Sequence, residues 1–363
     1  MNSSADLAEL LRRAVLAQDF GATPDPLDGG RPLRHFPSID LAVACFPAGG
    51  APALFANVLF SRAHPLGLVA GMAAGAGALQ GMRLLADQQD GQGRSIAWLP
   101  ESDWQRLDWL PLHGDSGPTL VAPYPASLLK LMVLVGLAWL IDQGRSRWDA
   151  PVSFEGQCRP VSDWALDMTA ISCNTATSAL VAHLHAIGAI RRDALGECHN
   201  ELHLLFAQLG LPTLRLANTR PDGGWGNAAG AGVGQLQMTA WDTVRLLWWL
   251  DPDAPAAPWL PARAPRLSAA SRGQVLRALE AQTLRVLMPD SLMAELRFAH
   301  KTGTTENYAS DAGIVRGIAP QRRHYLIAML SNLGSRYGVP EARLAALGAA
   351  IDAGLKPWLE SDS

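Results

Sequence analysis

The alternation of hydrophobic and polar positions predicts strands near both ends of the chain and helices between them. Strand-like apolar runs occupy residues 39–46, 82–85, 95–99, 119–124, 312–317 and 324–330. Helical patterns cover residues 5–18, 127–144, 161–171, 175–187, 199–209, 239–250, 269–287 and 340–355. Because strands precede and follow the helices in the part of the chain that begins at about residue 82, a single sheet must be assembled from both ends of that part, with an all-helical subdomain inserted between them.

The predicted helix at 127–144 is apolar almost throughout. Its interior, Leu131 to Ile141, is apolar on every side except near its start. Such a helix is buried in a protein core, and this one is too short to cross a bilayer. The polar residues at its start are therefore expected at the edge of a core.

A second apolar stretch, Pro65 to Met82, must be weighed as a membrane span. It carries no charge over 18 residues, which is about the lower limit for crossing a bilayer. Gly67, Gly71 and Gly75 follow the four-residue spacing of closely packed membrane helices. Five glycines and Gln80 nevertheless make the stretch weakly hydrophobic. We therefore predict a buried or surface-packed helix and expect no membrane association.

Residues 1–75 show no pattern with evident chemistry and are predicted to form an N-terminal extension. The catalytic module is predicted to span residues 76–363, beginning with a strand hairpin whose loop is Gln89 to Gly93. Within it, the helical subdomain covers about residues 127–265, including a polar loop at 217–234.

Composition limits the functional classes. The chain has 363 residues, of which 48% are hydrophobic and 17% charged, and its net charge is -3. This is a globular composition, and the charge gives no support for nucleic-acid or anionic-membrane binding. The four cysteines lack metal-type spacing, so we expect free thiols and neither a metal nor a cofactor. Residues 1–17 lack the pattern of a secretory signal, so we expect a cytoplasmic protein unless a leader has been removed.

The first candidate chemical motif is Ser127-Leu-Leu-Lys130. A serine hydroxyl is a weak nucleophile at neutral pH and needs an adjacent base. Residues three apart at a helix start project on one face, so Lys130 is expected within reach of Ser127. Burial beside other positive charge would lower the pKa of Lys130 and let it act as that base. A capping serine with an incidental lysine is the alternative, but an unpaired ammonium in so apolar a helix is costly.

Another motif, Lys301-Thr302-Gly303-Thr304, is typical of a strand edge that lines a cleft. Gly303 permits a close approach of the backbone. Lys301 would supply a fixed positive charge, and the hydroxyls of Thr302 and Thr304 would bind a substrate carboxylate. The backbone amides of Ser127 and Thr304 would form an oxyanion hole. An ordinary surface turn is the alternative interpretation.

Between these two motifs lies Ser172-Cys173-Asn174, and the three in this order resemble the motifs of class A β-lactamases and penicillin-binding proteins. The residues around them, 168–177 and 311–315, also resemble family sequences. The resemblance covers about residues 80–360. It implies an α/β (α+β) fold in which an antiparallel sheet is flanked by helices, with an inserted all-helical subdomain. It also implies that Ser172 relays a proton to the leaving group and that Asn174 holds an amide side chain of the substrate.

Two positions depart from the class A pattern. Class A enzymes carry a glutamate in an omega loop that activates the deacylating water, and its position aligns here with Arg220 in the loop 215–225. An arginine cannot act as a general base at neutral pH. Asp222 would substitute only if the loop changed its register. Cys173 stands where the family often has aspartate, and we interpret it as a neutral replacement that faces inward.

These features predict a serine acyl-hydrolase that forms an acyl-enzyme through Ser127. Its substrate would be a small acyl compound: a β-lactam, an ester or a peptide. The replacement of the glutamate by Arg220 leaves deacylation in doubt. A D-Ala-D-Ala peptidase is a second interpretation, although it would need a route of export. A binding protein or sensor that remains acylated is a third.

Overall fold

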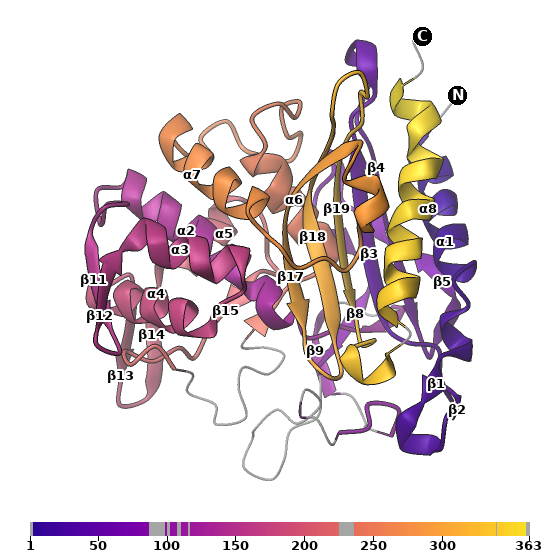
Figure 1. Cartoon of the computed structure of the whole chain (residues 1–363), viewed down its shortest axis with the longest axis horizontal. Coiled ribbons are helices and arrows are strands. Elements are labelled where there is room, and N and C mark those ends of the chain that lie inside the picture. Colours follow the sequence, from indigo (N-terminus) through magenta and orange to yellow (C-terminus); the bar gives the residue numbers. More distant parts are fainter. Residues whose placement is uncertain are drawn as a thin grey trace.

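The computed structural model describes residues 3–86, 99, 102–106, 110–114, 117–224, 236–338 and 340–360. It consists of a sheet between helices and a mainly helical region that lies beside the sheet (Figure 1). Within those ranges, every helix is too short or too polar to cross a bilayer.

The central sheet has six strands in the order β17-β18-β19-β3-β4-β5, and all neighbouring strands are antiparallel. The ladder between β19 and β3 joins the two halves of the sheet, with Ile327 opposite Val43. The predicted antiparallel sheet is confirmed, but the predicted strands at 82–85 and 119–124 do not join it, because its first half comes from residues 39–69. The strands are β3 (Ile39–Cys45), β4 (Leu54–Ser61), β5 (His64–Val69), β17 (Leu296–Thr304), β18 (Ala309–Gly317) and β19 (His324–Ser331).

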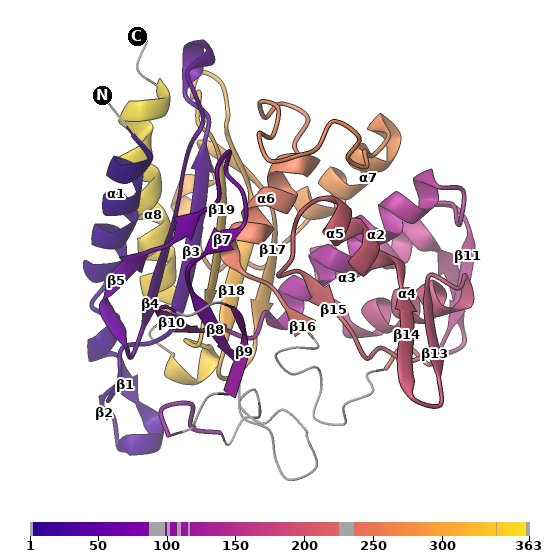
Figure 2. The ribbon, with the colours of Figure 1, turned by 180° about the vertical axis from the view of Figure 1, so that it is seen from behind.

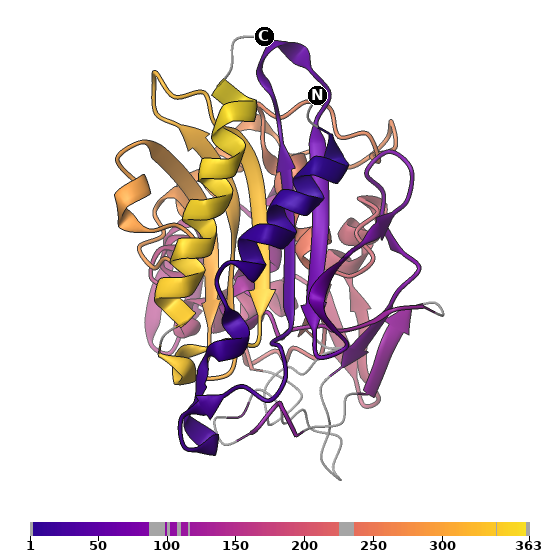
Figure 3. The ribbon, with the colours of Figure 1, turned by 90° about the vertical axis from the view of Figure 1, so that its right-hand side faces the viewer.

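Helices cover both faces of this sheet. Successive side chains along a strand point to opposite faces, so each strand contributes to two cores. On β3, Leu41 and Val43 belong to a core shared with α1 (Ser4–Leu16) and α8 (Pro340–Glu360), which cross that face in Figure 3. Ala42 and Ala44 belong to a second core, shared with α6 (Ala240–Leu250) and α2 (Lys130–Asp142). The small alanine side chains allow α6 to lie close to the sheet.

The predicted boundary at residue 75 is wrong. The strands β3, β4 and β5 lie before it and form half of the central sheet. Helix α1 packs against β4 and α8, and its Leu7 and Leu11 are fully buried. Local sequence patterns do not reveal pairing between strands at opposite ends of a chain. The described residues 3–75 are therefore an integral part of the sheet and its outer layer.

The predicted helix at 65–82 is also wrong, since this stretch forms β5 and the short pair β6 (Gly71–Met72) and β7 (Leu79–Gln80). Glycine is about 1 kcal/mol less favourable than alanine inside a helix, so five glycines oppose helix formation. Gly67 has a φ of 85°, and a Cβ there would lie 2.6 Å from the ring of Phe60. The glycines thus serve close packing at a sheet edge.

The predicted helices of the region beside the sheet are confirmed, although the helix expected at 269–287 ends at Glu280 and the following residues 282–287 are not helical. The region also carries short β-hairpins that the sequence analysis did not predict (Figure 2). Its helices are η4 (Ala126–Leu129), α2, α3 (Val161–Ala170), α4 (Asn174–Ala186), α5 (Glu201–Gln208) and α7 (Ala269–Glu280). Its hairpins pair β11 (Pro151–Phe154) with β12 (Gln157–Pro160), β13 (Ile190–Asp193) with β14 (Gly196–Asn200), and β15 (Arg215–Leu216) with β16 (Leu236–Gln237).

A small sheet leads into the first motif. The predicted strand at 82–85 is β8 (Arg83–Ala86), which pairs antiparallel with β9 (Leu110–Gly114) and parallel with β10 (Thr119–Val121). The expected hairpin loop 89–93 and, apart from Leu99, the expected strand 95–99 lie outside the described residues. The chain also forms a short pair at its start, β1 (Pro24–Asp25) with β2 (Arg31–Pro32).

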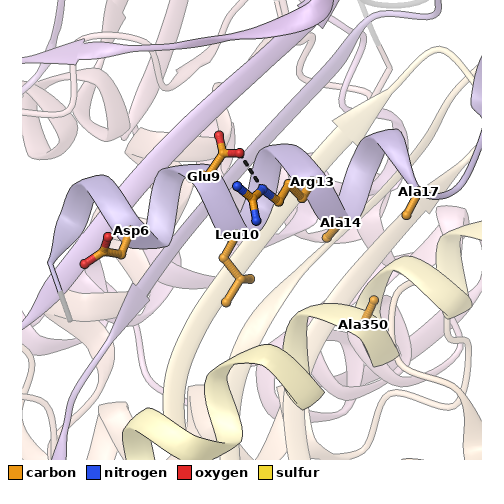
Figure 4. A pocket seen from close by; sticks show the side chains of 7 residues that line it. All are labelled: Asp6, Glu9, Leu10, Arg13, Ala14, Ala17 and Ala350. Atoms are coloured by element: carbon orange, nitrogen blue, oxygen red, sulfur yellow. Dashed lines mark hydrogen bonds and ion pairs between the residues drawn. The ribbon is translucent and has the colours of Figure 1, made fainter. Parts of the chain in front are cut away.

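An open hollow of about 570 Å³ lies between α1 and α8 (Figure 4). The carboxylate of Glu9 bonds the guanidinium groups of Arg12 at 2.8 Å and Arg13 at 2.5 Å. These two hydrogen bonds lower the pKa of Glu9 to about 2. The hollow is also lined by Leu10 and three alanines, so we interpret it as a packing feature of the outer helices.

The integration of residues 1–75 can be tested with a matched pair of leucines. Leu11 is fully buried between α1 and the sheet, whereas Leu27 is 45% exposed. We expect Leu11→Ala to lower the free energy of unfolding by about 2–5 kcal/mol, as for other buried leucines. Leu27→Ala should change it by less than about 0.5 kcal/mol. Urea unfolding of both variants measures the difference, and similar small losses would argue that α1 is only loosely attached.

Candidate active site

Ser127 lies on the turn η4 that connects β10 to the buried helix α2. The residue before it, Ala126, has a φ of 50°, in the left-handed region that residues with a Cβ rarely adopt. Such backbone strain persists only where the surrounding structure fixes it, and it is concentrated at functional sites. The half-buried Ser127 is therefore presented on a sharp, fixed turn.

Lys130, the first residue of α2, connects the first motif to the second. Its side chain is almost fully buried, and its Nζ donates to the backbone oxygen of Ser172 at 2.6 Å and to Asn174 Oδ1 at 2.8 Å. The Nζ also lies 3.1 Å from Ser172 Oγ. Burial lowers the pKa of Lys130 to about 8. Among the hydrogen bonds of the described residues there is none between Lys130 and Ser127, so the base role predicted for Lys130 remains a prediction.

Ser172 occupies the junction between α3 and α4 in a strained conformation, with a φ of 57°. This left-handed residue turns the chain so that both its hydroxyl and its carbonyl oxygen face Lys130. Next to it, Cys173 caps α4, since its Sγ accepts a hydrogen bond from the amide of Ala176 at 3.4 Å. The thiol thus replaces an oxygen at the helix N-cap and is partly buried.

Lys301 approaches the same serine from the sheet. Its Nζ donates to Ser172 Oγ at 2.9 Å and to the backbone oxygen of Thr302 at 2.9 Å, and its side chain is fully buried. Burial, together with the positive charge of Lys130, lowers the pKa of Lys301 to about 7, although Asp311 opposes this shift. Two buried amines from different parts of the fold therefore converge on one hydroxyl group.

Gly303 brings the edge strand β17 against the turn that carries Ser127. A Cβ at this position would lie 2.3 Å from the backbone oxygen of Pro125 and 2.7 Å from the amide of Leu128, so only glycine fits. Ser310 Oγ spans the same contact by donating to Pro125 O at 2.8 Å. The contact agrees with the close approach expected at Gly303 and brings the third motif to the first.

The two threonines of the third motif lie differently from Lys301. Alternation along β17 places Thr302 on the opposite face of the strand, where it is buried and paired in register with Asp311. Thr304, at the end of β17, is exposed. Their part in binding a carboxylate, and the oxyanion hole formed by the amides of Ser127 and Thr304, remain predictions.

The described part of the omega loop, residues 217–224, packs tightly against α4. Gly223 has a φ of 81°, and a Cβ there would lie 2.3 Å from the backbone oxygen of Ser178. Arg220 is exposed and pairs with Asp222 at 3.3 Å. Asp222 also accepts a hydrogen bond from the amide of Gly224 at 2.8 Å, and this bond, with Arg220, lowers its pKa. An exposed carboxylate that is engaged in this way is a weak general base.

Sequence reasoning missed two buried polar groups that lie on the face of β17 opposite to the side chain of Lys301. Asp311 and His300 are fully buried, and Asp311 Oδ1 lies 2.8 Å from His300 Nδ1. The only signal in the sequence was a charged residue at the start of an otherwise apolar strand, 311–315. No group of three or more potential metal ligands occurs in the part of the chain that the structure describes.

Solved structures share this fold. A β-lactamase from Xanthomonas campestris pv. campestris is 12% identical, with a TM-score of 0.53 over 97% of this chain and 98% of that chain. A mutant of the class A β-lactamase of the last common ancestor of Gram-negative bacteria is 16% identical, with a TM-score of 0.51 over 95% and 98%. A mutant of PBP-A, solved as an acyl-enzyme complex with penicillin G, is 14% identical, with a TM-score of 0.50 over 97% and 100%.

Comparison with curated protein sequences gives no match. The model of the β-lactamase enzyme family matches residues 122–353, which contain all three motifs and well over half of the chain. The motifs, the sheet and the family model agree, and the protein belongs to the β-lactamase enzyme family of serine hydrolases.

Proposed function

We propose that the protein is a serine acyl-hydrolase that is acylated at Ser127 by β-lactams or related esters and amides and releases the acyl group slowly. The observation that carries this proposal is the convergence of Lys130 and Lys301 on Ser172 Oγ, beside the turn that presents Ser127. Burying two amines costs free energy of folding. Their lowered pKa values suit proton transfer near neutral pH.

In the proposed acylation step, Ser127 Oγ attacks the substrate carbonyl carbon and gives its proton to neutral Lys130. The C–N or C–O bond then breaks, and the leaving group takes a proton from Ser172, which recovers one from Lys130. The hydrogen bond between Lys130 and Ser172 supports this relay. Lys301, in its charged form, would bind the carboxylate of the substrate, and the amides of Ser127 and Thr304 would stabilise the oxyanion.

Slow release rests on the omega loop. Arg220 stands at the position of the glutamate, and Asp222 is held by Arg220 and by the amide of Gly224. Neither is suited to activate water against the acyl-enzyme. The similar fold of a PBP-A mutant, captured as an acyl-enzyme with penicillin G, supports a penicillin-binding mode for this fold. The same observation favours an acylated sensor as the second candidate.

One experiment separates these activities. The purified protein is incubated with a fluorescent penicillin, and its intact mass is followed over time. A mass increase of one ligand that persists for hours supports slow release. Rapid hydrolysis without adduct would show an efficient deacylating base, and no mass increase at any time would refute acylation by penicillins.

The nucleophile is tested by Ser127→Ala. Because the hydroxyl is the proposed attacking group, the variant should lose covalent labelling by penicillin and by fluorophosphonate probes while keeping its melting temperature. Ser335→Ala, which removes the hydroxyl of an exposed serine in the turn η6 (Ser335–Tyr337), serves as the control and should label normally. Peptide mapping that finds the label on Cys173 in Ser127→Ala would overturn the assignment.

The two lysines should act in opposite protonation states. Lys130 must be neutral to accept a proton, so acylation should rise with pH through its pKa of about 8. Lys301 must be charged to bind a carboxylate, so acylation by penicillin should fall as the pH rises through about 7. A neutral ester should show only the rising limb. Acylation rates of both substrates between pH 5 and 10 measure the difference.

Lysine variants provide the control for these profiles. Lys130→Ala should slow both substrates by about 10²–10⁴-fold, the usual effect of losing a positioned base. Lys301→Ala should slow penicillin far more than the neutral ester. Equal losses on the two substrates in Lys301→Ala would mean that Lys301 is not a carboxylate site.

Arg220→Glu tests the cause of slow release. A glutamate at this position would supply a general base, so turnover of the penicillin adduct should rise, at most by the 10²–10⁴-fold that such a base commonly contributes. Arg266→Glu makes the same charge change in the exposed connection 251–267 and should leave the adduct lifetime unchanged. A wild-type protein that already hydrolyses penicillin rapidly would contradict the interpretation of Arg220.

A further inference from the structure

Asp311 lies at a junction beneath the active-site strand. It is fully buried on β18, opposite Thr302 of β17. Its Oδ2 accepts hydrogen bonds from the amides of Val286 at 3.1 Å and Leu287 at 3.0 Å, and its Oδ1 lies 2.8 Å from His300 Nδ1. A buried carboxylate is costly unless its oxygens are bonded, and this one has three partners.

His300 is itself fixed on both sides. It is buried, and its ring stacks on that of Phe298 with a centroid separation of 4.0 Å. Because Phe298, His300 and Thr302 alternate with Lys301 along β17, the His300–Asp311 pair lies on the face of the strand opposite to the ammonium of Lys301. The pair therefore supports the strand from behind and leaves the cleft side to Lys301.

The segment that Asp311 binds, residues 282–287, also contacts the turn of the second motif. Gln282 Nε2 donates to the backbone oxygen of Thr169 at 2.8 Å. The backbone amide of Thr283 donates to the backbone oxygen of Ala170 at 3.0 Å. These contacts lie two and three residues before Ser172 in sequence. At its other end the segment is held by the carboxylate of Asp311. Asp311 thus connects the turn of Ser172, through one short segment, to the strand of Lys301.

The charges around Lys301 are few. Lys130 from α2 contributes a positive charge across Ser172, and His300 lies next to it on β17. From β18, Asp311 contributes the negative charge, which opposes the lowering of the Lys301 pKa by burial and by Lys130. Without this charge, burial and the positive charge of Lys130 would still lower the pKa of Lys301, and Asp311 would no longer oppose them.

We propose that Asp311 is a positioning residue for substrate carboxylate recognition: from behind β17 it places a negative charge beside the strand of Lys301 and holds the segment 282–287 between the end of α3 before Ser172 and that strand. The proposal rests on the proposed function of Lys301 as the carboxylate site. It assigns to Asp311 and His300 no direct contact with the substrate.

Asp311→Asn tests the charge with little change of shape, since an amide oxygen can still accept from Val286 and Leu287. The ζ-nitrogen of Lys301 is titrated by NMR in the unacylated protein. Its pKa should fall by about 0.5–1 unit, less than the 1–3 units typical of an opposite charge within about 4–6 Å. This readout needs no substrate, so it is independent of whether the proposed function holds.

Kinetics give the second readout. In Asp311→Asn the falling limb of penicillin acylation should move to lower pH by the same amount, and at pH 7 acylation should slow by about two- to fivefold, which follows from that shift. Acylation by a neutral ester should be unchanged. An equal loss on both substrates, or an unshifted Lys301 titration, would overturn the proposal.

Asp352→Asn is the matched control. Asp352 is a buried carboxylate of α8 that accepts a hydrogen bond from Tyr325 Oη at 3.0 Å and lies 3.3 Å from Arg323 Nε. It should lose stability as Asp311→Asn does but keep the wild-type titration of Lys301. If Asp311→Asn does not fold, Asp311→Ser is measured in the same way. Failure of both to fold, while Asp352→Asn folds, would assign Asp311 a purely structural role and overturn the proposal.

Discussion

The meeting of two lysine amines at Ser172 is the constraint on which the rest of the site depends. Burying an ammonium costs free energy unless acceptors replace water. Here the acceptors are backbone and side-chain oxygens: the carbonyl of Ser172, Asn174 Oδ1, the carbonyl of Thr302 and the shared Ser172 Oγ. Each of these oxygens must be held in place by structure around it. The strained turn at Ser172 supplies two of them, and its left-handed φ of 57° is explained by this requirement.

The fold meets this requirement by bringing the start of helix α2 into contact with the edge strand β17. Lys130 starts a helix that is buried on nearly all sides, and Lys301 lies in a strand paired along its length with β18. The backbone of β17 contacts the turn before α2 directly at Gly303, since a Cβ there would overlap Pro125 and Leu128. In turn, β18 pairs with β19, and β19 pairs with β3 from the N-terminal part of the chain. The N-terminal strands therefore help to position Lys301, although they contribute no side chain to the site.

Much of this could be predicted from the sequence, for identifiable reasons. The apolar run after Lys130 required a buried helix, and the motif residues Ser172 and Lys301 are indeed brought together with Lys130. The errors concern long-range pairing and glycine. Nothing local in residues 39–45 reveals that they pair with β19, and the apolar stretch 65–82 fits a helix until the φ of Gly67 and its contact with Phe60 are known. Asp311 was missed because its partners are backbone amides and a histidine from other segments, which no spacing rule detects.

The buried groups around Ser172 and the exposed groups of the loop 217–224 differ in what a substitution would cost. Lys130 and Lys301 are buried and both bond Ser172 Oγ, so a change at any of these three residues leaves a charge or an oxygen without its partner, which is costly. Arg220 and Asp222 are exposed in a loop, and their contacts are with each other and with Gly224. Substitution there affects little beyond the loop itself. An exchange at Arg220 should therefore cost little stability, whereas the convergence of Lys130 and Lys301 on Ser172 Oγ joins the buried helix α2 to the strand β17.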